Sequence, residues 1–278
     1  MKVILSRKGF DSANGGIFSP IFDDNTMLSL PIPSKDIDKD FIKYESLVCM
    51  GVGLDKILHD LGYKGVDICH LDPDLDISRR KQTVEGWVPA FGQINQSAKY
   101  LENCEVEEGD LFLFFGNFRH VKMKDGKYYY ASENEKSVYF GKPIQVIWGY
   151  MQIGRIITEV EELKKFSWHP HSCDKRIYEE KNNTIYTARE KLTFADLPGC
   201  GLFSYDEKRV LTMPGKSKAT WKKEAAYDIG NLKKGKDHTK ITRKNSAKNE
   251  EGIYYAGIWQ ELVLEDNDIS ESWAKSLF

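Results

Sequence analysis

The stretch GDLFLFFGNFRH, residues 109–120, determines the predicted fold. Its apolar run Leu111–Phe115 has the length and aromatic content of a buried strand. A polar segment, residues 116–120, follows the run directly. Side chains just beyond a strand end commonly form sites in folds that mix helices and sheets, so Asn117 and Arg119 are candidate site residues. The alternative is a turn with a surface arginine.

The chain downstream continues as a β unit. Asp125-Gly126 is a strong hairpin signal, and residues 144–150 and 155–160 form two further apolar runs. We therefore predict a compact unit of about five strands over residues 109–160.

Segments outside this unit indicate both strands and helices. Residues 2–6 and 184–188 have strand patterns, and residues 54–61 carry apolar side chains at helical spacing. The predicted fold class is α+β. Its core is a mixed, mainly antiparallel sheet or a small β-barrel of the PUA-like type, with peripheral helices. We predict a single domain over residues 1–278.

Composition indicates a globular protein. The chain has 278 residues, 41% hydrophobic and 12% aromatic, with a formal net charge of -2. Such a balance gives no global attraction to nucleic acid or membrane. The five cysteines form no C-x-x-C pair, and no apolar stretch reaches membrane-spanning length. We expect reduced thiols, a cytoplasmic location and no membrane partner.

One segment, residues 216–248, departs from this balance. It holds eleven Lys or Arg against three carboxylates, a local charge of +8. The sequence predicts a Lys-rich insertion here, either a solvated surface loop or a contact for nucleic-acid phosphates.

The densest polar cluster is VDICHLDPDLD, residues 66–76. His70, Asp72 and Asp74 alternate, so on an extended chain they would share one face. Imidazole and carboxylates can hold a divalent metal or act as general acid and base. Asp-Pro often begins a turn, so the alternative is an Asx-turn whose carboxylates cap backbone N–H groups.

A second imidazole pair follows in Trp168–His171. His169 and His171 flank Pro170, which favours extended backbone before it and can direct both rings to one side. The pair is equally compatible with a plain loop. A joint site with His70 is the functional interpretation.

Two further candidates concern substrate binding. The Gly-rich loop over residues 6–16 carries Arg7 and Asp11, and it could bind phosphate or simply connect two elements. Trp148 offers a face for base stacking, although core packing is the more frequent role of tryptophan. We predict that loops 6–16, 66–76, 116–120 and 168–171 converge beside the β unit.

Several sequence blocks, in this order, resemble the nucleotide modification associated domain 3 family: SRKGFDS, GGIFSPI, HLDPD, GDLFLFFGNFR, IWGYMQIG, HPH and NNTIY. They extend from Ser6 to about Tyr186, with weaker likeness to Leu264. The tail GIWQELVL and the Lys-rich segment depart from the family pattern. The resemblance implies a role in DNA base modification. It carries over positions without roles: Arg7, Asp11, His70, Asp72, Asp74, Asn117, Arg119, His169 and His171.

Two functions follow as hypotheses. The first is an enzyme acting on a nucleotide or nucleic-acid base, with substrate bound by Arg7, Asp11, Asn117 and Trp148. Its catalytic residues would be His70, Asp72, Asp74, Arg119, His169 and His171. The second is a non-catalytic module of the PUA-like type that binds a modified base or nucleic acid. A divalent metal is the one cofactor that the residues suggest, and the oligomeric state does not follow from the sequence.

Overall fold

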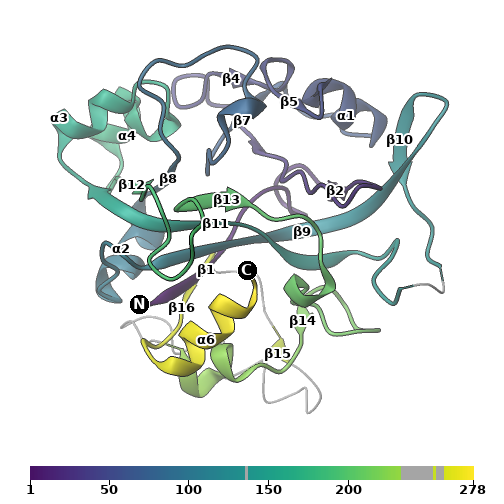
Figure 1. Cartoon of the computed structure of the whole chain (residues 1–278). Coiled ribbons are helices and arrows are strands. Elements are labelled where there is room, and N and C mark those ends of the chain that lie inside the picture. The colour runs from purple at the N-terminus through teal and green to yellow at the C-terminus, as the bar shows by residue number, and fades with distance from the viewer. Residues whose placement is uncertain (135–136, 233–252, 255–259) are drawn as a thin grey trace.

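The computed structural model describes residues 1–134, 137–232, 253–254 and 260–278. Within these ranges a nine-stranded sheet crosses the molecule, with β9 and β11 as its longest strands (Figure 1). The strands of this sheet are β1 (Val3–Arg7), β2 (Ser19–Ile21), β8 (Ala90–Gln93), β9 (Leu111–Lys124), β10 (Lys127–Tyr130), β11 (Ile144–Ile157), β12 (Thr184–Ala188), β13 (Cys200–Leu202) and β16 (Glu261–Val263).

The sheet is mixed and mainly antiparallel. Its main path runs β16-β1-β9-β11-β12-β8, with β2 and β10 also paired to β9 and β13 to β11. Strands β1 and β2 run parallel to β9, and the other pairs are antiparallel. The predicted α+β class is therefore confirmed. The barrel alternative is wrong, because the path stays open between β16 and β8 in the described part of the chain.

Short elements surround this sheet. The small strands are β3 (Ile32–Pro33), β4 (Ile42–Lys43), β5 (Val48–Cys49), β6 (Val52–Gly53), β7 (Ile68–His70), β14 (Thr220–Trp221) and β15 (Ile253–Tyr254). The α-helices are α1 (Leu54–Asp60), α2 (Asn95–Asn103), α3 (Val160–Leu163), α4 (Asp174–Glu179) and α6 (Asp268–Ser276). The 3₁₀ turns are η1 (Tyr44–Ser46), η2 (Ile77–Arg79), η3 (Lys164–Phe166), η4 (Pro170–Ser172), η5 (Glu207–Arg209), η6 (Ala225–Tyr227) and η7 (Ile229–Asn231).

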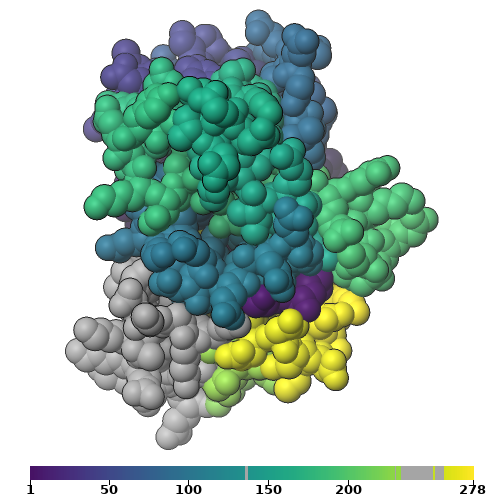
Figure 2. All heavy atoms as spheres, turned by 90° about the vertical axis from the view of Figure 1, so that its left-hand side faces the viewer, coloured from purple at the N-terminus to yellow at the C-terminus, as the bar shows by residue number. Residues whose placement is uncertain are grey.

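The elements form layers on either side of the sheet. Helix α1 and the small sheet β3-β7-β4 lie on one side, and α6 lies on the other (Figure 1). Viewed from the side, the segment with α3 and α4 lies above α2, and α6 lies below (Figure 2). Residues Leu111–Phe115 are fully buried between these layers. Burying each such side chain contributes about 1.5–3 kcal/mol, which makes β9 the centre of the core.

The predicted unit over residues 109–160 has a simpler form than expected. It consists of β9, β10 and β11, and the hairpin at Asp125-Gly126 is confirmed. Residues 116–120 are not a loop but continue β9. Gly149 and Gly154 do not divide β11 into two strands. Instead, the pairing register shifts close to each glycine, which keeps the strand continuous.

Of the predicted Lys-rich segment, residues 233–248 lie outside the described residues. All five cysteines lie inside them, and none forms a disulfide bond. No helix in the described ranges has the length and apolar character needed to cross a bilayer.

Candidate functional site

A pocket of about 320 Å³ opens between the small sheet β3-β7-β4 and strand β8. Its lining comes from segments that are far apart in the sequence: the end of β1, the end of β7, strand β8, turn η4 and helix α4. The charged and imidazole side chains among the lining residues include Arg7, Asp11, Asp40, His70, Asp72, His171 and Arg176.

Three of these side chains converge at the floor of the pocket. His70 Nε2 lies 3.6 Å and His171 Nε2 lies 3.8 Å from Asp72 Oδ2. One ligand atom from each of the three residues lies within 4.8 Å of the others. The arrangement brings two imidazoles and a carboxylate together, which is a set suited to holding a proton or a divalent cation.

Strand β8 fixes Asp72. The Gly92 N–H donates to Asp72 Oδ1 at 2.7 Å, and His169 Nε2 lies 3.3 Å from the same oxygen. A Cβ on residue 92 would lie 2.3 Å from the His171 ring. Only glycine therefore lets β8 contact Asp72 while His171 packs against its backbone.

The ring of His70 is held by a buried ion pair. His70 Nδ1 lies 2.8 Å from Asp40 Oδ1, and the guanidinium of Arg176 binds both Asp40 oxygens at 3.1 and 3.2 Å. Because Asp40 is an acceptor, Nδ1 of His70 carries the hydrogen in this contact. Nε2 is then the nitrogen of His70 that faces Asp72.

Asn183 orients the ring of His171 in the same sense. Asn183 Nδ2 donates to the His171 carbonyl at 2.7 Å, which fixes the amide orientation. Asn183 Oδ1 then accepts from His171 Nδ1 at 2.9 Å. The hydrogen is on Nδ1, so Nε2 of His171 presents a lone pair to Asp72.

Burial and neighbours shift the pKa of these groups. Burial holds the pKa of His171 well below its ordinary value. Burial alone would raise the pKa of Asp72, but contacts with His169 and His70 hold it well below its ordinary value. Burial would likewise lower the pKa of His70, yet Asp40 and Asp72 outweigh it and raise that pKa. The floor of the pocket therefore combines the neutral imidazole of His171 with the ionised carboxylate of Asp72.

Two arginines hold the segment Trp168–His171 in place. Arg176 donates to the Pro170 carbonyl at 2.8 Å and pairs with Asp40. Arg80 donates to the Trp168 carbonyl at 3.4 Å and pairs with Asp74 at 2.8 Å. Each arginine thus ties an aspartate of residues 40–74 to the backbone beside the imidazoles.

Some of the predicted site residues line the pocket or lie directly behind it, and the others lie elsewhere in the structure. His70, Asp72 and His171 meet in the pocket, with buried His169 behind Asp72. Arg7 and Asp11 lie at the rim as an ion pair of 3.5 Å. The Asp74 side chain points away from the pocket. Its Oδ2 accepts hydrogen bonds from Arg80 Nε at 2.8 Å and from Trp87 Nε1 at 2.9 Å.

Three predicted residues lie elsewhere. Arg119 donates to the carbonyls of Gly141 and Ala131 at 2.7 and 3.1 Å, so its guanidinium group is bonded to the backbone. Asn117 is buried between Phe10 and Gln145, with hydrogen bonds of 3.3 and 3.1 Å. The expectation that the 116–120 segment converges on the pocket is corrected, because the segment belongs to β9.

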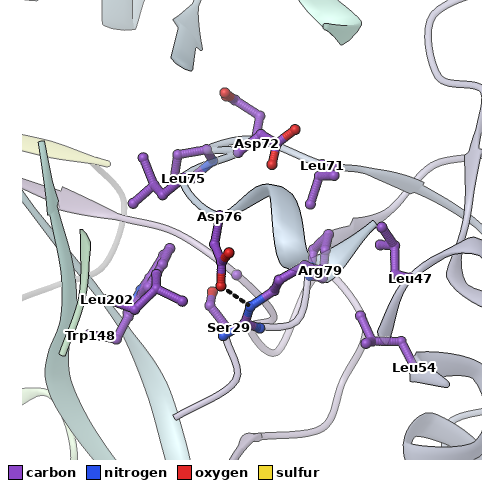
Figure 3. Close-up of a pocket in the computed structure, with 14 residues that line it drawn as sticks. Ser29, Leu47, Leu54, Leu71, Asp72, Leu75, Asp76, Arg79, Trp148 and Leu202 are labelled. Atoms are coloured by element: carbon purple, nitrogen blue, oxygen red, sulfur yellow. Dashed lines mark ion pairs between the residues drawn. The ribbon is translucent and has the colours of Figure 1, made fainter. Parts of the chain in front are cut away.

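Trp148 borders a different cavity, shown in Figure 3. This cavity measures about 40 Å³ and lies below the segment that carries Asp72. Leu75 and Leu202 gather near Trp148, and Asp76 faces Arg79 at 4.0 Å in the middle of the view. One water molecule takes up about 30 Å³ in the liquid. The cavity is only a little larger than that, so it is too small for a base.

Sequence reasoning missed three residues of the site: Asp40, Arg176 and Asn183. Asp40 lies in a charged segment that reads as exposed, and Arg176 lies on a short, polar helix. Their roles arise from tertiary partners, so no local spacing could reveal them. Asn183 was within reach, because it belongs to the block NNTIY that carries the family resemblance.

Comparison with known proteins gives one match. The family model described as nucleotide modification associated domain 3 matches residues 2–265. Neither the curated proteins nor the solved structures contain a match. The match spans the main sheet and every residue of the pocket. The chain therefore belongs to the nucleotide modification associated domain 3 family.

Proposed function

We propose that the chain is an enzyme that modifies a nucleotide or a nucleic-acid base in the pocket above His70, Asp72 and His171. The observation that carries the proposal is the convergence of these three groups at the floor of an open pocket. Family membership supports the substrate class, since the family is associated with nucleotide modification.

The size of the pocket supports a small substrate portion. Its volume of about 320 Å³ falls at the lower end of typical ligand sites, which span about 300–1,000 Å³. One base or one nucleotide suits this space, whereas a duplex does not. A nucleic-acid substrate would therefore present a single extruded or terminal base, as base-modifying enzymes require.

The rim offers groups for recognition. The side chains of Arg7 and Lys8 are 17% and 9% exposed, and they are paired with Asp11 and Glu261. Gln93 and Asn14 add amide groups of the kind that read base edges. In the proposal, these side chains orient the substrate, and the three groups at the floor act on its reacting atom.

The roles at the floor differ from those of the supporting residues. His70, Asp72 and His171 face the substrate. His169 and Asp40 are positioning residues, because they touch the reacting groups from behind. Asp74 and Arg119 take no part in the proposed reaction, since neither lines the pocket.

The test is nucleoside mass spectrometry on cells that express the chain. Genomic DNA is digested, free nucleotides are extracted, and the profiles are compared with cells expressing Asp72→Asn. We expect a new nucleoside or nucleotide mass that Asp72→Asn abolishes and that His59→Ala retains, because His59 is exposed and remote from the pocket.

Identical profiles for the unmodified chain and Asp72→Asn would contradict the proposal. The non-catalytic alternative predicts a different result. The purified chain would bind a base or nucleotide and release it with the same mass as before binding. Equilibrium dialysis with unmodified and modified nucleotides separates the two functions.

A further inference from the structure

We infer that His70, Asp72 and His171 bind one divalent transition-metal ion through His70 Nε2, Asp72 Oδ2 and His171 Nε2. The inference deepens the proposed function, because it names the cofactor class of the same site. Metal binding is measured directly and without turnover, so its failure is distinguishable from failure of the proposed function.

Two imidazole nitrogens and one carboxylate oxygen converge at one place, and each imidazole is held at its other nitrogen by a separate partner. Nδ1 of His70 is engaged by Asp40, and Nδ1 of His171 is engaged by Asn183. Nε2 of each ring therefore faces the Asp72 carboxylate, and both nitrogens can bind a metal ion once they are deprotonated. Acceptors brought together in a buried site repel one another unless a cation lies between them.

A proton satisfies this arrangement poorly. The contacts from Asp72 Oδ2 to the two inward nitrogens are 3.6 and 3.8 Å, beyond hydrogen-bond distance. One proton could also bridge only one of the two contacts. The spacing leaves room for an ion at the centre of all three atoms.

The distances agree with a metal centre that closes slightly on loading. Metal–nitrogen and metal–oxygen bonds of about 2.1 Å place tetrahedral ligand atoms about 3.4 Å apart. The observed contacts of 3.6 and 3.8 Å exceed this by a few tenths of an ångström. All three ligand atoms lie within 4.8 Å of one another, so the two imidazoles would move toward the ion on loading.

The donor set selects the metal class. Two imidazoles and one carboxylate suit Zn²⁺, Fe²⁺, Co²⁺ or Mn²⁺, whereas Mg²⁺ and Ca²⁺ prefer oxygen ligands throughout. Three protein ligands leave coordination positions open, which is the arrangement of catalytic centres. All three ligands line the 320 Å³ pocket, so the open positions face the place where substrate would bind.

The surrounding shell has the form that metal ligands require. Asp40 holds the outer nitrogen of His70, and Asn183 holds the outer nitrogen of His171. Carboxylate–histidine pairs of this kind fix the tautomer and raise ligand basicity. Gly92 N–H donates to the other oxygen of Asp72, and His169 Nε2 lies 3.3 Å from it, which leaves Oδ2 for the ion.

The test is titration of the metal-free full chain with Co²⁺ alone. Visible absorption reports the coordination geometry, and calorimetry reports affinity and stoichiometry. We expect one Co²⁺ per chain with intense d–d bands. Asp72→Asn and His171→Gln, which keep side-chain size, should weaken Co²⁺ binding at least 100-fold. Asp40→Asn should weaken it about 10–100-fold, as loss of an outer-shell partner does.

The matched control is His59→Ala, whose side chain is 84% exposed. It should bind Co²⁺ with unchanged affinity and an unchanged spectrum. Circular dichroism and thermal unfolding establish that each variant is folded. Folded Asp72→Asn and His171→Gln proteins that bind Co²⁺ as the unmodified chain does would overturn the inference. So would an unmodified chain without stoichiometric binding or d–d bands.

Discussion

At the scale of single residues, the site differs from the rest of the core in how its imidazoles are partnered. His70 and His171 each have an outer partner that dictates which nitrogen faces inward. His120, by contrast, is 6% exposed on β9, and its Nδ1 has no hydrogen-bond partner among the residues that the structure describes. In our proposal the first arrangement serves a ligand, whereas His120 packs against the rings of Phe140 and Tyr205.

His120 gives a prediction on stability and pH. Burial lowers its pKa from 6.5 to about 4. Below pH 6.5 the unfolded chain binds a proton that the folded chain does not bind until about pH 4, so stability falls as pH decreases through this window. We expect His120→Phe, which keeps the ring contacts with Phe140 and Tyr205, to remove about 1–2 kcal/mol of the loss between pH 7 and pH 5.

Urea unfolding at both pH values measures the effect. His59→Ala is the control, because an exposed imidazole leaves the pH dependence of unfolding unchanged. Equal losses of stability in His120→Phe and the unmodified chain would show that other groups control the acid response.

Residue types in the sequence pointed to part of the site. His70, Asp72 and His171 stand out because imidazole and carboxylate have few roles when clustered. Arg119 lies apart from the pocket in which we expected it, since its sequence position is compatible equally with a phosphate and with backbone carbonyls. The structure shows the carbonyls of Gly141 and Ala131. A donor's partner is a tertiary property that sequence position alone does not fix.

At the scale of elements, local patterns predicted the strongest strands and helices. The run Leu111–Phe115, helix α1 and strand β12 all lie where apolar spacing places them. The continuation of β9 through Gly116 and Asn117 was not predictable, because both residues favour turns. Pairing with β11 and burial of the Asn117 amide override that preference.

Strand β8 gives a prediction about the site. A Cβ at Gly92 would lie 2.3 Å from the His171 ring and displace it. Gly92→Ala should therefore weaken Co²⁺ binding at least tenfold while the chain remains folded. Gly230→Ala is the matched control, since a Cβ there meets no atom of the described residues within 4 Å. Equal Co²⁺ affinity of the two variants in calorimetry would mean that β8 does not set the position of His171.

At the scale of the whole molecule, two arginine–aspartate ion pairs join residues 40–80 to the Trp168–His171 segment. We call these pairs, Asp40–Arg176 and Asp74–Arg80, the arginine clamps. The Asp40–Arg176 clamp is the more buried, with side chains 3% and 8% exposed. Removing one partner of such a pair leaves a buried charge uncompensated. We expect Arg176→Met to lower the free energy of unfolding by about 3 kcal/mol and to weaken Co²⁺ binding through His70.

Arg155→Met is the control for this change. Arg155 is 62% exposed and pairs with Glu162 at 3.4 Å, so its loss should cost less than about 0.5 kcal/mol. The double variant Asp40→Asn with Arg176→Met should regain part of the stability, because no unpaired charge remains. Urea unfolding that gives equal costs for Arg176→Met and Arg155→Met would show that the clamp does not support the fold.

We propose that two distant chain segments, residues 70–72 and His171, form one cation-binding centre. Anomalous diffraction from a crystal of the Co²⁺-soaked chain, recorded at the cobalt edge, tests it most directly. We predict a single strong peak about 2.0–2.3 Å from His70 Nε2, Asp72 Oδ2 and His171 Nε2. A map without a peak between these three atoms, or with its strongest peak at other residues, would contradict the account.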